Sequence, residues 1–85
     1  LTGHGVGKDL HEYPPVPCLL LDDIDQTPIL KEGMTLAIEV IYSEGTYRTV
    51  TQSDGWTIAT ADGKIAAVFE KTIAVKGDGC LVLTP

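Results

Sequence analysis

The sequence is poor in basic residues and has no long apolar run. Six Lys and Arg residues stand against twelve Asp and Glu, which gives a formal net charge of −6. Because an acidic chain repels phosphate backbones and anionic lipid head groups, this balance argues against a nucleic-acid partner. No apolar run approaches the roughly 18 residues that cross a bilayer, so no membrane segment is expected.

Cysteine is also scarce. Cys18 and Cys80 are far apart and form no Cys-x-x-Cys pair, so the sequence signals neither a disulfide framework nor a zinc ribbon. No charged start followed by an apolar signal segment is present. A reducing cytoplasm is the expected location. The first residue is Leu1 rather than methionine, and we expect a fragment or a processed chain.

What is present is a strand-rich pattern over a single small unit, residues 1–85. The segments 34–42 and 65–75 are dense in β-branched and aromatic residues and are bounded by turn signals, which predicts two central strands. Shorter strands are expected at 46–50, 56–60 and 80–83. Four prolines predict an extended loop over 13–33. No segment repeats its apolar residues at the 3.6-residue spacing of a helix, so the chain is expected to be mainly β.

The segment GHGVGKDLHE, residues 3–12, places glycine at every second position before a His-Glu pair. In an extended chain the glycines at 3, 5 and 7 leave one face bare, because side chains alternate between faces. Glycine in a strand marks a bend or a close backbone approach. The spacing matches neither the dinucleotide-binding fingerprint nor the phosphate loop.

Two glutamates lie inside the predicted central strands. Glu39 and Glu70 have apolar neighbours on both faces, and an unpaired carboxylate there costs several kcal/mol. Each could pair with Lys71 or Arg48, point into water from an edge strand, or bind a metal. Together with His4 they form a mixed nitrogen and oxygen set that suits Mn, Fe, Co or Zn. Three ligands are too few for a paired-metal site, which would need further carboxylates from elsewhere.

Several blocks carry a family resemblance. GHGVGKDLHEYPPVP, LKEGMTLAIEV and DGWTIATADGKIAAVFEKTIAV together resemble the C-terminal half of a type I methionine aminopeptidase. These blocks span nearly the whole chain, and they follow one another in the same order and at the same spacing as in the family. It implies the C-terminal half of an α+β pita-bread (creatinase/aminopeptidase) fold, with a curved antiparallel sheet. Because the covering helices come mainly from the upstream half, the resemblance also implies an exposed apolar sheet face.

The resemblance implies a dinuclear metal centre. His4, Glu39 and Glu70 correspond to ligands of two divalent metal ions (Co, Mn, Fe or Zn), with Glu70 bridging both. Glu39 is also implied as the carboxylate that shuttles the proton. The family's other ligands lie in the N-terminal half, so this chain alone is expected to be inactive, with that half as its partner.

The resemblance also implies substrate contacts. His11 corresponds to a histidine that contacts the substrate and stabilises the tetrahedral intermediate. Trp56 and Leu10 correspond to positions that border the pocket for the methionine side chain. Alternative interpretations are that His11 is an exposed loop residue paired with Glu12, and that Trp56 is a core anchor.

The implied reaction is hydrolysis of the N-terminal methionine from nascent polypeptides. Two departures bear on it: the family commonly has IEP at 38–40 and EHT at 70–72, where this chain has IEV and EKT. Two alternatives remain open. One is an Xaa-Pro aminopeptidase or prolidase, which shares the motif order. The other is a non-catalytic pita-bread module that binds peptides or proteins.

Overall fold

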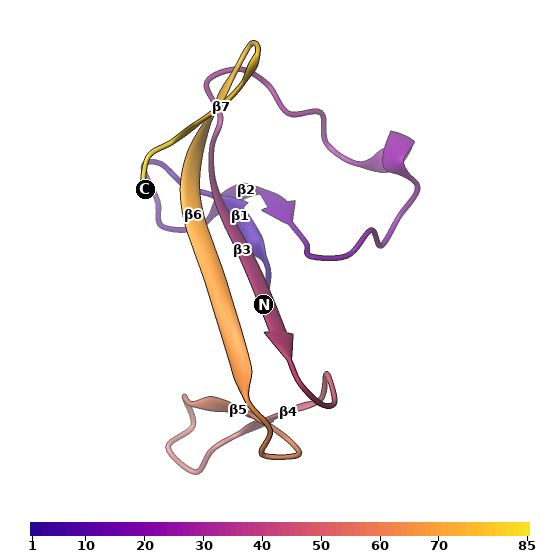
Figure 1. Ribbon diagram of the computed structural model, residues 1–85. Helices are drawn as coiled ribbons and strands as arrows, with labels where there is room; N and C mark the ends of the chain where they lie inside the picture. The colour runs from indigo at the N-terminus through magenta and orange to yellow at the C-terminus, as the bar shows by residue number, and fades with distance from the viewer.

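The computed structural model describes all residues from 1 to 85 and is built almost entirely of strands (Figure 1). One short 3-10 helix, η1, is the only helical element, and no helix is long and apolar enough to cross a membrane. The elements in chain order are β1 (Gly3–Gly5), β2 (Glu12–Val16), η1 (Ile24–Gln26), β3 (Thr35–Ser43), β4 (Thr49–Thr51), β5 (Ile58–Thr60), β6 (Ala66–Lys76) and β7 (Gly79–Val82).

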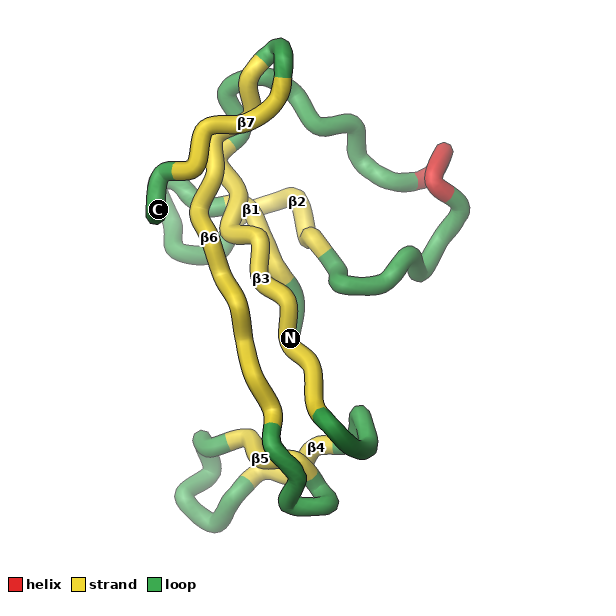
Figure 2. The backbone as a smooth tube through the Cα atoms, viewed as in Figure 1, coloured by secondary structure: helices red, strands yellow, loops and turns green.

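The strands form a five-stranded antiparallel sheet with the order β2-β1-β3-β6-β7 and a separate ribbon of β4 and β5. The long strands β3 and β6 are paired from Thr35 opposite Ala74 to Ser43 opposite Ala66. The ribbon lies at the end of this pair, and the segment between β2 and β3 swings away from the sheet (Figure 2). The expected mainly β fold is confirmed.

The expectation of a loop over 13–33 was wrong at its start. Residues 12–16 form β2, which pairs with β1 although it contains Pro14 and Pro15. Proline lacks a backbone N–H and is tolerated in a strand only at the edge of a sheet, and β2 is an edge strand. The rest of the segment is irregular apart from η1.

The expected extended run over the glycine-rich segment is also shorter than predicted. Pairing is confined to Gly3–Gly5, after which the Val6 N–H donates to the Thr35 carbonyl at 3.0 Å. The chain then turns, because the Gly7 N–H donates to the Asp9 carbonyl at 3.1 Å. The His-Glu pair therefore follows a turn rather than a continued strand.

The expected exposed apolar face is present. Only five of the 85 residues are buried, with Leu36 and Ala37 as the apolar core. On the sheet, Phe69 is 67% exposed and Val40 is 46% exposed, and both line a hollow of about 460 Å³. Because the apolar face of a sheet normally packs against another layer, this face is suited to contact further polypeptide.

An aspartate organises the turn of the β4–β5 ribbon. The Thr57 hydroxyl and the backbone N–H groups of Trp56 and Thr57 all donate to the Asp54 carboxylate. The Thr57 hydroxyl is the main cause that lowers the pKa of Asp54, followed by the Trp56 N–H. In the turn that follows β5, the pKa of Asp62 is also lowered, chiefly by the Thr46 backbone N–H that donates to its carboxylate. The ribbon therefore presents Trp56 from an ordered turn.

Candidate metal centre

Strand register brings the predicted ligands onto one face of the sheet. Glu39 of β3 lies directly opposite Glu70 of β6. His4 of β1 lies opposite Ala37, which is two residues before Glu39 and therefore on the same face. Like charges directly opposite each other on paired strands are destabilising. The two carboxylates thus form a site that a cation would stabilise.

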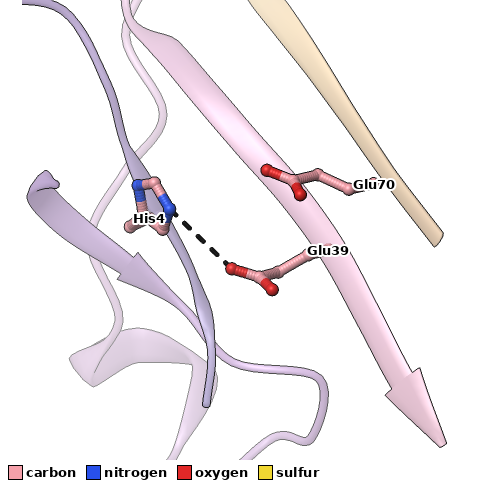
Figure 3. A group of neighbouring side chains, drawn as sticks. All are labelled: His4, Glu39 and Glu70. Carbon is pink, nitrogen blue, oxygen red and sulfur yellow. Dashed lines mark ion pairs between the residues drawn. The ribbon is translucent and has the colours of Figure 1, made fainter. Parts of the chain in front are cut away.

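The three side chains converge (Figure 3). One potential ligand atom from each of His4, Glu39 and Glu70 lies within 4.8 Å of the others. The His4 Nε2 atom is 3.8 Å from Glu39 Oε1, and these side chains are only 14% and 17% exposed. Neither Lys71 nor Arg48 forms an ion pair with Glu39 or Glu70, so the prediction of these two residues as partners was wrong. Lys71 lines the apolar hollow described above.

The orientation of the His4 ring suits a metal ligand. Its Nδ1 atom lies 2.7 Å from the Gly5 carbonyl oxygen, which can only accept a hydrogen bond, so Nδ1 carries the proton. In the neutral imidazole, Nε2 then carries a lone pair and faces the Glu39 carboxylate. A second hydrogen bond that fixes the ring in this way is typical of histidine ligands. The residues present therefore fit a divalent cation.

The glycines beside His4 allow the strands to come together. A Cβ atom at Gly3 would lie 2.6 Å from the Ala37 carbonyl oxygen and 3.0 Å from that of Val16. A Cβ atom at Gly5 would clash with the Tyr13 carbonyl oxygen. The predicted close backbone approach is confirmed: β1 fits between β2 and β3 only without side chains at these two positions.

The other predicted residues divide into two groups. The His11 ring lies against the His4 ring, with centroids 4.4 Å apart and planes at 60°. Leu10 is exposed, and Trp56 is 87% exposed in the ribbon turn. The structure therefore brings His11 to the cluster. It does not bury Trp56, so the interpretation of Trp56 as a core anchor was wrong.

A hollow beside the carboxylates was missed by the sequence reasoning. It measures about 400 Å³ and is lined by both glutamates together with Ile41, Val68 and Ala66. Ile41 comes two residues after Glu39, and Val68 comes two residues before Glu70, so strand alternation puts both on the same face. The two-residue alternation of side chains along a strand was the signal that could have identified Ile41 and Val68 from the sequence.

An imidazole and two carboxylates gathered on one face of an antiparallel sheet are a donor set that suits a metal-binding protein. Residues 1–77 match metallopeptidase family M24, and the chain belongs to that family. Family membership implies that a divalent metal is bound.

Individual proteins of known name and structure can also be compared with this chain. The chain is 46% identical over 82 residues to the methionine aminopeptidase of Aquifex aeolicus, covering 96% of this chain and 32% of that protein. It is 46% identical over 83 residues to methionine aminopeptidase 1 of Bacillus subtilis, covering 98% of this chain and 33% of that protein. The crystal structure of the Thermotoga maritima methionine aminopeptidase superimposes with a TM-score of 0.90 at 46% identity, covering 98% and 32% of the two chains. The chain thus spans about a third of the length of these relatives.

Proposed function

We propose that the chain forms part of a methionine aminopeptidase and supplies three ligands of its metal centre. The observation that carries the proposal is the convergence of His4, Glu39 and Glu70 within 4.8 Å. It occurs in a chain that is 46% identical to relatives of that name. The substrate is the N-terminal methionine of nascent polypeptides in the cytoplasm. Residues 1–85 are the C-terminal part of the catalytic domain.

His4, Glu39 and Glu70 would hold two divalent ions, drawn from Co, Mn, Fe or Zn, with Glu70 shared between them. Bound ions supply Lewis acidity for the hydrolysis of the first peptide bond. Glu39 accepts the proton that the attacking water gives up. His11 donates a hydrogen bond to the oxygen of the scissile carbonyl as negative charge develops there.

The methionine side chain is proposed to be bordered by Leu10 and Trp56. Both are exposed in this chain, so they are free to form a pocket wall with further polypeptide. The partner is the N-terminal half of the same enzyme, which supplies the remaining ligands. The exposed apolar face that contains Val40 and Phe69 provides a surface for contact with that half.

The test uses a two-chain enzyme. This chain is combined with the Aquifex aeolicus methionine aminopeptidase lacking the segment that matches it, so that the two polypeptides together supply one full length. With Mn²⁺ or Co²⁺ added, release of methionine from Met-Gly-Met is expected, and release of alanine from Ala-Pro-Ala is not. Metal-dependent cleavage of Ala-Pro-Ala alone would replace the proposal with an Xaa-Pro peptidase. Binding of Met-Gly-Met without any cleavage would replace it with a peptide-binding module.

A further inference from the structure

We propose that Glu12 is the positioning residue for His11, because its carboxylate fixes the turn over residues 7–11 that holds the His11 ring against His4. The inference rests on the proposed function, in which His11 contacts the substrate. The turn has no strand pairing of its own, since β1 ends at Gly5 and β2 begins at Glu12. Its shape therefore depends on local contacts.

Two hydrogen bonds close the turn. The Asp9 backbone N–H donates to Glu12 Oε1 at 2.8 Å. The Gly7 N–H donates to the Asp9 carbonyl at 3.1 Å. Glu12 is half-buried, whereas Leu10 and His11 are exposed. The carboxylate is thus bonded within the turn, whereas the His11 ring is exposed and lies against His4.

The third glycine of the motif is explained by the same carboxylate. A Cβ atom at Gly7 would lie 3.0 Å from Glu12 Oε2 and 3.4 Å from Oε1. Gly3 and Gly5 leave room for neighbouring backbone, but Gly7 leaves room for a side chain. Because few Cβ contacts are shorter than 3.4 Å, a larger residue at position 7 would push the Glu12 carboxylate away by a few tenths of an ångström.

Glu12 also links the turn to the metal-ligand strand. Its backbone is paired opposite Gly5, next to His4, at an irregularity in the register of β1 and β2. The side chain reaches back from there to Asp9. No ion pair joins Glu12 to His11, so the alternative in which these neighbours pair was wrong. The carboxylate acts on His11 through the backbone, and it sets the 4.4 Å separation of the two rings.

The kinetic test compares Glu12→Ala with Glu12→Gln in the two-chain enzyme. Alanine removes the acceptor for the Asp9 N–H, and kcat for Met-Gly-Met is expected to fall about 10- to 100-fold, as for other residues that orient a functional group. KM and Co²⁺ affinity should stay within about twofold, because the metal ligands are held by the sheet. Glutamine keeps an acceptor oxygen and should restore kcat to within about threefold of wild type. Wild-type kcat in Glu12→Ala, or no rescue by glutamine, would overturn the proposal.

A structural readout makes the inference independent of catalysis. His4 and His11 are the only two histidines, so isotope labelling of histidine in this chain gives two sets of ring signals. A nuclear Overhauser effect between the rings is expected in the wild type and in Glu12→Gln and should be lost in Glu12→Ala. Its persistence in Glu12→Ala would overturn the positioning role. Loss of the effect in an enzyme that releases no methionine would support the positioning role and overturn the proposed function alone.

Discussion

Replacement of Glu70 by alanine in the two-chain enzyme is expected to lower methionine release about a thousandfold. The proposed metal centre would lose its shared ligand, and about 4 kcal/mol of transition-state stabilisation would be lost with it. The one other carboxylate of the cluster is Glu39, which lies opposite Glu70 and is itself a proposed ligand, so it cannot replace Glu70. The measurement is kcat/KM for Met-Gly-Met at saturating Mn²⁺.

The matched control for this change is Glu44→Ala. Glu44 is an exposed glutamate just after β3 and does not belong to the cluster. Its removal should leave kcat/KM within about twofold of wild type, as expected for a surface substitution. If Glu70→Ala keeps more than about a tenth of wild-type kcat/KM, only about 1.4 kcal/mol is lost and Glu70 is not a shared ligand.

A second large effect is expected for the stability of the sheet. Gly5→Ala should lower the free energy of unfolding by about 1–3 kcal/mol or more, the usual cost of forcing extra atoms into a close-packed site. The new Cβ atom would lie 2.8 Å from the Tyr13 carbonyl carbon and 3.0 Å from the Glu12 carbonyl oxygen, and would clash with the Tyr13 oxygen. These are backbone atoms, so no rotamer change relieves the contact. The measurement is urea unfolding of the two-chain enzyme.

Gly77→Ala is the matched glycine control. Its Cβ atom would meet only the Glu32 carboxylate, at 3.5 Å, which is an ordinary contact. The free energy of unfolding should change by no more than about 0.5 kcal/mol. Equal stability of the Gly5→Ala and Gly77→Ala enzymes would show that β1 does not need the close approach inferred from the structure.

The long strands could be predicted from the sequence, whereas β2 could not. Segments 34–42 and 65–75 fall within one residue of β3 and β6 at each end, because β-branched residues bounded by turns give a strong local signal. The two prolines of β2 give the opposite local signal. They are accommodated only because β2 is an edge strand, and the sequence does not state the strand order.

The site was predictable in its ligand types but not in its geometry. Two glutamates in apolar strands and a histidine between glycines point to a cation by their chemistry alone. Their convergence depends on register, because a slip of one residue between β3 and β6 would send Glu70 to the opposite face from Glu39. The role inferred for Glu12 depends on the turn over residues 7–11, which the prediction of an extended chain through the three glycines did not include.

Binding of Co²⁺ to the two-chain enzyme, measured by isothermal titration calorimetry, tests the metal centre most directly. His4→Ala removes a proposed ligand, whereas His11→Ala removes a ring that lies 4.4 Å away without belonging to the cluster. We expect His4→Ala to weaken Co²⁺ binding at least about 100-fold, beyond the 10- to 100-fold typical of residues that only support a ligand. His11→Ala should bind as the wild type does. Equal Co²⁺ affinity in His4→Ala and wild type would contradict the assignment of His4, Glu39 and Glu70 as a metal centre.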